Sequence, residues 1–178
     1  MSVRRRDVLM LMLAGIGRRV RAQGLALQFR PLARPVVVPI EGLATPWRAQ
    51  PFVAEGVTLS SAATPNQPIR ITGMVVRTGA GSDPEKFTAV CLKCPHEGCD
   101  VDFMSDPNRL PPEVKEEIGH AVDHSVYICP CHNSTFKAED GERLAGPAPR
   151  GLYRFHVTKV SDAAVEIAEV EEDVLIFV

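Results

Sequence analysis

Cys94-Pro95-His96-Glu97-Gly98-Cys99 and Cys129-Pro130-Cys131-His132-Asn133-Ser134 stand about thirty residues apart in a chain of 178 residues. Together the two blocks supply two thiolates, two imidazoles and two further cysteines. Zinc and iron-sulfur clusters both accept a ligand set of sulfur and nitrogen donors. A zinc ribbon has no use for the two further cysteines, so the blocks favour a cluster.

The two blocks resemble those of the Rieske iron-sulfur proteins of cytochrome bc complexes, which read C-x-H-x-G-C and C-P-C-H-x-S. A third stretch, Gly146-Pro147-Ala148-Pro149, is similar to the proline loop of that family. The three motifs occur in the family's order, and the resemblance covers roughly residues 70–160. It implies one [2Fe-2S] cluster of the Rieske type.

By this resemblance, Cys94 and Cys129 hold one iron while His96 and His132 hold the other. With neutral imidazoles the oxidised cluster carries no net charge, whereas four thiolates would make it a dianion. An electron is added more easily to the neutral centre, which raises the reduction potential to roughly −150 to +300 mV. The two histidines are also the groups expected to meet the substrate, because a ring nitrogen not bound to iron can take up a proton with the electron.

The remaining cysteines of the blocks, Cys99 and Cys131, are implied by the resemblance to form a disulfide. This bond would close a loop of about 33 residues and contribute roughly 3–4 kcal/mol in the chain-entropy model. Such a bond needs an oxidising compartment.

Other positions near the blocks are expected to contact the cluster or tune its potential. Ser134 matches a family hydroxyl that donates to cluster sulfur, and Gly146 and Pro147 belong to the proline loop. Phe136 stands where many quinol-oxidising members have a tyrosine, so one donor is missing. Glu97 replaces a residue that is usually apolar. Both departures predict a lowered potential, which suits a menaquinol-linked complex.

The resemblance implies an all-β protein, a Rieske-type antiparallel β-sandwich base domain with a small cluster-binding subdomain at about residues 91–150, and the composition agrees with short strands and many turns. Fifteen prolines and thirteen glycines argue against a helical bundle. A short helix is expected at 111–118, between the two blocks. Strands are expected near 36–40, 70–77, 87–92, 125–128, 153–160, 165–168 and 174–178.

Residues 1–22 carry a strongly basic leader. Arg4-Arg5-Arg6 is followed by the apolar run 8–16, which is too short to span a bilayer. The pattern resembles a twin-arginine export signal, and an uncleaved helix at the membrane surface is the alternative. We therefore expect a bacterial protein in the periplasm or on the outer face of the cytoplasmic membrane.

Residues 23–52 are rich in proline and predict an extended linker that runs into a first edge strand, with 53–178 forming the Rieske domain. In the bc branch a linker joins a hinged head domain to its anchor, and residues 30–51 are the candidate here.

Two features lie apart from the motifs. Cys91 falls in an apolar run and predicts a buried strand thiol, and the acidic run 166–173 predicts a solvated strand edge and hairpin.

The leading functional hypothesis is an electron-transfer subunit of a quinol-oxidising cytochrome bc-type complex, with b-type and c-type cytochrome partners and quinol at the cluster tip. The chain would reach the membrane through the complex or through its N-terminal segment and would not be a catalyst alone. The alternative is the small subunit of an arsenite-oxidase-type molybdoenzyme. Soluble Rieske ferredoxins and ring-hydroxylating oxygenases lack the additional cysteine pair. Outside the leader the chain has no basic stripe, so nucleic acid is not an expected partner.

Overall fold

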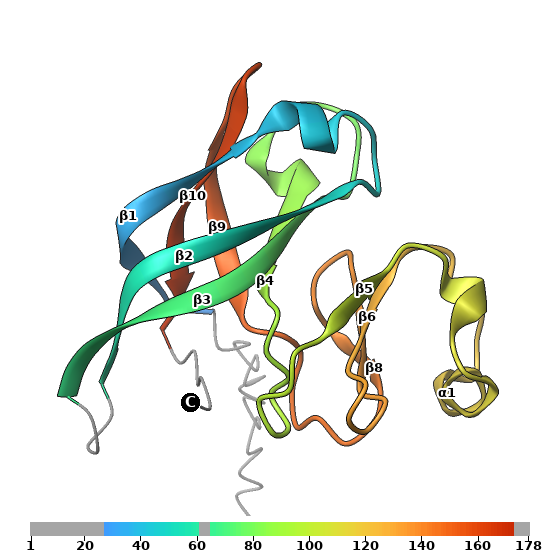
Figure 1. The fold of residues 1–178 in the computed structure, drawn as a ribbon. Coiled ribbons are helices and arrows are strands. Elements are labelled where there is room, and N and C mark those ends of the chain that lie inside the picture. Colours follow the sequence, from blue (N-terminus) through green and yellow to red (C-terminus); the bar gives the residue numbers. More distant parts are fainter. Residues whose placement is uncertain (1–26, 61–64, 173–178) are drawn as a thin grey trace, which may run out of the picture.

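The computed structural model describes residues 27–60 and 65–172, which are built mainly from antiparallel strands and the loops that connect them (Figure 1). The predicted leader at 1–22 and the strand predicted at 174–178 fall outside the described residues. Over the two described ranges, no helix is both long and apolar enough to cross a bilayer.

Six strands form the larger sheet, which we call the base domain, in the order β1-β10-β9-β4-β3-β2. They are β1 (Phe29–Pro39), β2 (Ala49–Ser60), β3 (Pro65–Arg77), β4 (Phe87–Cys91), β9 (Arg154–Val160) and β10 (Ala164–Glu171). Every neighbouring pair is antiparallel. The edge strands β1 and β2 also contact each other, so the sheet curls around one apolar core. The predicted all-β, sandwich-like fold class is confirmed.

The proline-rich segment before the blocks is a strand and not a free linker. Pro31, Pro35 and Pro39 all lie in β1, which is an edge strand, where a missing backbone N–H is tolerated. β1 pairs with β10 on both sides of an irregularity between Pro31 and Val36. After the 3₁₀ helix η1 (Ile40–Leu43), β2 begins at Ala49. The first edge strand predicted near 36–40 is therefore present and begins earlier, at Phe29, whereas the candidate hinge at 30–51 is largely part of the sheet.

Strands β3 and β4 lie between the core of the base domain and the core of the cluster subdomain. Along β4, Phe87, Ala89 and Cys91 point into the base core. Val90 of β4 and Val76 of β3 point the other way, into a second apolar cluster that contains the predicted ligand thiols. Alternate side chains of a strand face opposite sides, so one strand serves both cores. Between β3 and β4 the chain forms the 3₁₀ helix η2 (Pro84–Lys86).

Cys91 is buried in its strand, as expected. Its thiol belongs to the base core, on the opposite side of β4 from the ligand thiols. Burial raises the pKa of the Cys91 thiol to about 11, so it stays protonated and neutral near pH 7.

Four short strands form the smaller sheet of the cluster subdomain, in the order β5-β6-β7-β8. They are β5 (Asp102–Met104), β6 (Val126–Ile128), β7 (Thr135–Lys137) and β8 (Arg143–Ala145). Tyr127 of β6 faces the ligand thiols, whereas Val126 and Ile128 face a third apolar cluster. The ligand blocks are the loops at the end of this sheet, before β5 and between β6 and β7.

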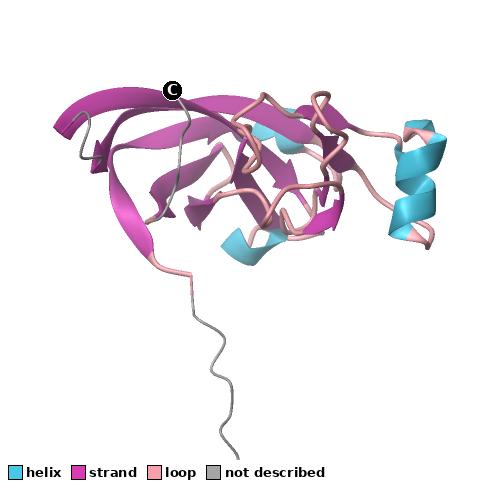
Figure 2. Cartoon of the chain, turned by 90° about the horizontal axis from the view of Figure 1, so that it is seen from below, coloured by secondary structure: helices cyan, strands magenta, loops and turns pink. Residues whose placement is uncertain are grey.

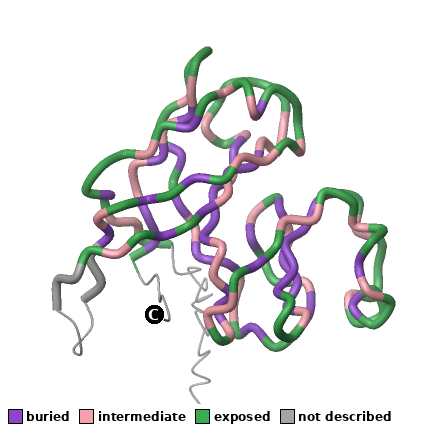
Figure 3. The backbone as a smooth tube through the Cα atoms, viewed as in Figure 1, coloured by how far each residue is buried: buried purple, intermediate pink, exposed green. Residues whose placement is uncertain are grey.

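The predicted helix between the blocks is present as α1 (Pro112–Ile118), preceded by the 3₁₀ helix η3 (Pro107–Arg109). Pro112 lies in its first turn, and Gly119 ends it in the left-handed region with a φ of 72°. Val114 anchors the helix to the third apolar cluster. Figure 2 shows α1 set apart from the strands, and Figure 3 shows that most of its surface is exposed.

The acidic run near the C-terminus is less solvated than predicted. β10 lies between β1 and β9 and is an interior strand. Glu171 is only 3% exposed, because its carboxylate pairs with the Arg150 guanidinium and accepts the Arg154 backbone N–H at 3.0 Å. The prediction of a solvated edge is therefore wrong at this residue. A buried carboxylate needs partners of this kind, and the acidic sequence around Glu171 does not indicate where they come from.

Candidate metal centre

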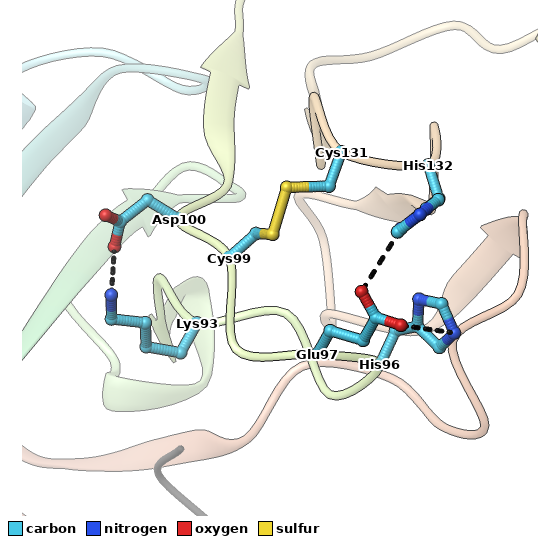
Figure 4. Close-up of a disulfide and its surroundings, with 7 residues drawn as sticks. All are labelled: Lys93, His96, Glu97, Cys99, Asp100, Cys131 and His132. Atoms are coloured by element: carbon cyan, nitrogen blue, oxygen red, sulfur yellow. Dashed lines mark ion pairs between the residues drawn. A yellow bond between two sulfur atoms is a disulfide. The ribbon is translucent and has the colours of Figure 1, made fainter. Parts of the chain in front are cut away.

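The first ligand block is a compact turn closed by its own backbone. The Cys94 N–H donates to the Cys99 carbonyl at 2.8 Å, and the Gly98 N–H donates to the Cys94 carbonyl at 2.9 Å. At the base of the loop, Lys93 and Asp100 form an isolated β-bridge and an ion pair of 2.8 Å (Figure 4). These bonds fix the positions of the side chains between them.

The second ligand block repeats this backbone pattern. The Cys129 N–H donates to the Ser134 carbonyl at 2.8 Å, and the Asn133 N–H donates to the Cys129 carbonyl at 2.9 Å. The fifth residue of each block has a positive φ, 74° at Gly98 and 58° at Asn133. Glycine and asparagine are the residues that enter this region most readily. The sequence did not reveal that the two blocks are equivalent turns, because Asn133 stands where Gly98 stands in the first.

The predicted thiol ligands, Cys94 and Cys129, lie together at the inner end of the site. Both side chains are buried, pack in one apolar cluster and interact with each other. Burial raises the pKa of the Cys94 thiol, and the neighbouring Cys129 thiol acts in the same direction, while the His96 backbone N–H and the Ser134 hydroxyl act in the opposite direction. Donor groups beside a buried sulfur favour the thiolate form in which cysteine binds a metal.

The predicted imidazole ligands lie at the outer end. The rings of His96 and His132 are 4.9 Å apart between centroids and meet edge to face at 82°. Their side chains are 29% and 47% exposed. The Glu97 carboxylate lies between them, 3.9 Å from Nε2 of His96 and 3.8 Å from Nδ1 of His132 (Figure 4). The site therefore has buried thiols and partly exposed imidazoles.

A disulfide joins Cys99 to Cys131, as predicted. It connects the two ligand loops across 32 residues of chain (Figure 4). The two loops thus cannot separate while the bond is intact, which keeps the four predicted ligands close together.

The predicted tuning residues lie behind the second block. Ser134 is fully buried, and its Oγ accepts the Ala148 backbone N–H at 3.1 Å. Phe136 is also fully buried and packs in the same apolar cluster as Cys94 and Cys129. The Phe136 ring carries no hydroxyl, so of these two residues only Ser134 can donate a hydrogen bond to sulfur. Ala148 was not predicted, because a backbone N–H leaves no mark in the sequence.

The proline loop lies directly on the second block. Gly146 has a φ of 86°, and a Cβ at this position would lie 2.4 Å from the Ser134 Cα. Only glycine fits both the conformation and the space. Pro147 and Pro149 are exposed and Ala148 is buried, so the loop covers Ser134 with its backbone and keeps both proline rings at the surface.

The donor set fits a metal centre with mixed ligation. Two buried thiols face inward, two imidazoles face outward, and a disulfide and a glycine-proline loop enclose them. The fold and this site define a small β-domain built around an iron-sulfur centre. Residues 60–161 match the Rieske [2Fe-2S] domain, which is more than half of the chain. The chain therefore belongs to the Rieske [2Fe-2S] domain family and is an electron-transfer protein with one [2Fe-2S] cluster. A search of curated proteins finds no match.

Proposed function

We propose that this chain is the electron-transfer subunit of a quinol-oxidising cytochrome bc-type complex. In this proposal Cys94 and Cys129 hold one iron of the cluster and His96 and His132 hold the other. The [2Fe-2S] cluster, when bound, accepts one electron at the mild potential that mixed ligation gives. The chain passes that electron to a c-type haem.

The observation that carries the proposal is the exposure of the two imidazoles. His96 and His132 lie side by side at the outer end of the site, and neither side chain is buried. A ring nitrogen that is not bound to iron is then available to accept a hydrogen bond from a quinol hydroxyl and to take up its proton. A purely structural metal site has no need to present its ligands to a partner.

The direct test is to isolate the complex from its own host. The full chain, tagged at its C-terminus, is purified in mild detergent, and the haem spectrum and molybdopterin content of the eluate are measured. The proposal predicts co-purification of b-type and c-type haem, and reduction of the c-type haem by added quinol. An eluate with neither haem would overturn it.

A second candidate, the small subunit of an arsenite-oxidase-type molybdoenzyme, is favoured by Phe136. This ring is fully buried against the ligand thiols, and the family branch with a molybdoenzyme partner often has phenylalanine there. The proline loop at Gly146 favours the first candidate. A molybdopterin subunit in the same eluate, without b-type haem, would support the second.

We also propose that the chain works on the outer face of the cytoplasmic membrane of a bacterium. The Cys99–Cys131 disulfide supports an oxidising compartment. N-terminal sequencing of the exported protein tests the role of residues 1–22. A start at Gln23 would mean that the basic leader is removed, and an intact Met1 or Ser2 would mean that it is kept as a membrane-surface segment.

A further inference from the structure

Both backbone polar groups of Gly146, in the proline loop, are hydrogen-bonded to side chains. The Glu117 carboxylate, which comes from α1, accepts the Gly146 N–H at 2.8 Å. The Arg143 guanidinium, which comes from β8, donates to the Gly146 carbonyl at 2.6 Å. The helix inserted between the two ligand blocks therefore reaches across 29 residues of chain to the loop that covers the second block.

This contact matters because of what Gly146 touches. Gly146 lies so close to Ser134 that any Cβ would collide with the Ser134 backbone. Two residues later, the Ala148 N–H donates to the Ser134 Oγ at 3.1 Å. Since that bond uses an acceptor site of the hydroxyl, the single O–H of Ser134 is left to donate elsewhere. Cys94 and Cys129 pack with Ala148 in one buried cluster, and the Ser134 hydroxyl interacts with the Cys94 thiol, so we expect the Cys94 sulfur to be its acceptor.

We propose that Glu117 is a positioning residue for the metal centre: by holding Gly146 it keeps the proline loop on Ser134, and so keeps the Ser134 hydroxyl directed at the Cys94 sulfur. The inference rests on the ligand set proposed above. It gives a role to α1, which contributes no ligand of its own and lies mostly at the surface.

The direction in which the midpoint potential shifts distinguishes a positioning role of Glu117 from a direct effect of its negative charge. A hydrogen bond to a ligand sulfur stabilises the reduced, more negative centre and raises its potential. Loss of the Glu117 contact should loosen this bond and lower the potential. Loss of the Glu117 negative charge alone would raise the potential, because a nearby anion disfavours an added electron. The two mechanisms thus predict opposite shifts for the same substitution.

The experiment is a redox titration of the purified full-length protein, followed by electron paramagnetic resonance. Glu117→Ala and Glu117→Asp both remove the reach to Gly146, but only the first removes the charge. Glu117→Gln removes the charge and keeps an acceptor oxygen. Glu116→Ala, one residue earlier on the exposed surface of α1, is the matched control. We expect a lower midpoint for the Ala and Asp variants, and an unchanged or slightly higher midpoint for Glu117→Gln and Glu116→Ala.

A Ser134→Ala background shows whether the effect passes through the serine. With the hydroxyl gone, Glu117→Ala should no longer lower the midpoint. The inference is overturned if Glu117→Ala raises the midpoint or leaves it unchanged, or if its downward shift persists without Ser134. Amide hydrogen exchange of the peptide covering residues 143–150 gives a second readout, and Glu117→Ala should speed the exchange relative to Glu116→Ala.

These measurements use neither quinol nor a partner subunit, so they stand apart from the proposed complex. A wild-type protein without a Rieske-type signal would defeat the ligand set itself. A normal wild-type signal with no effect of Glu117 would defeat only the positioning role.

Discussion

Glu97→Gln removes a negative charge from between the two predicted imidazole ligands, and we expect it to raise the midpoint reduction potential. The carboxylate lies within 4 Å of a nitrogen of each ring, and no lysine or arginine pairs with it among the described residues. Reduction adds a negative charge to the centre that these rings hold. The Glu97 carboxylate therefore disfavours reduction, whereas the neutral amide introduced by Glu97→Gln does not.

The size of this shift follows from distance and exposure. Two unit charges about 4 Å apart interact by about 1 kcal/mol in water and about 4 kcal/mol at an effective dielectric constant of about 20. The Glu97 side chain is 59% exposed, which favours the lower value because solvent screens it. For a one-electron couple a factor of ten is about 59 mV, or 1.4 kcal/mol, so we expect a rise of about 40 mV.

The assay is a spectroscopic redox titration of both proteins at one pH, in low and in high salt. The difference should shrink at high ionic strength, because salt screens exposed charges. Asp100→Asn is the matched control, since Asp100 is also exposed in this loop but pairs with Lys93 at 2.8 Å. It should shift the potential less than Glu97→Gln. An unchanged or lower potential for Glu97→Gln would refute the electrostatic reasoning.

Further predictions concern the buried side of the site. Phe136→Tyr should raise the midpoint potential, because the ring packs with both ligand thiols and a new hydroxyl would donate to sulfur; an unchanged or lower value in a redox titration would contradict this. Asn133→Ala should cost about 1 kcal/mol, because alanine tolerates a φ of 58° poorly, while Asn133→Gly should not destabilise the fold; thermal unfolding followed at the visible absorbance of the cluster ranks the two variants. Tyr127→Phe should stabilise the protein by about 1 kcal/mol, because the fully buried Tyr127 hydroxyl has no hydrogen-bond partner among the described residues; a loss of stability in the same assay would show that the hydroxyl is bonded. Cys131→Ser should cost about 4 kcal/mol in the chain-entropy model and speed cluster loss under mild denaturant, since it opens a loop of 32 residues; equal loss rates in variant and wild type would rule out a stabilising role.

The fold class and the disulfide were predictable because both depend on local, strongly patterned residues. The two blocks contain the cysteines and histidines whose spacing is typical of the family, and the short helix begins with proline and ends at Gly119. The strands of the base domain show apolar residues with strand spacing, and the structure extends several of them. β3 begins at Pro65 where the prediction began near residue 70.

The predictions were wrong where contacts between residues distant in sequence determine the structure. The prolines predicted a linker before a first edge strand near residue 36, but this edge strand already begins at Phe29, and its pairing with β10 is invisible in the local sequence. The acidic run predicts a solvated Glu171, but the carboxylate pairs with Arg150, which lies 21 residues earlier in the chain. The bond from Glu117 to Gly146 joins residues 29 positions apart, and nothing in either neighbourhood indicates the other.

The central claim is that two histidines and two cysteines share one [2Fe-2S] cluster, and pulsed electron paramagnetic resonance tests it most directly. The protein is produced with ¹⁵N-labelled histidine in an otherwise unlabelled background, and the reduced state is examined for nitrogen couplings. We predict strong couplings from two histidine nitrogens, and loss of this signal in both His96→Ala and His132→Ala. A cluster signal without ¹⁵N coupling, or one that survives either substitution unchanged, would contradict the account.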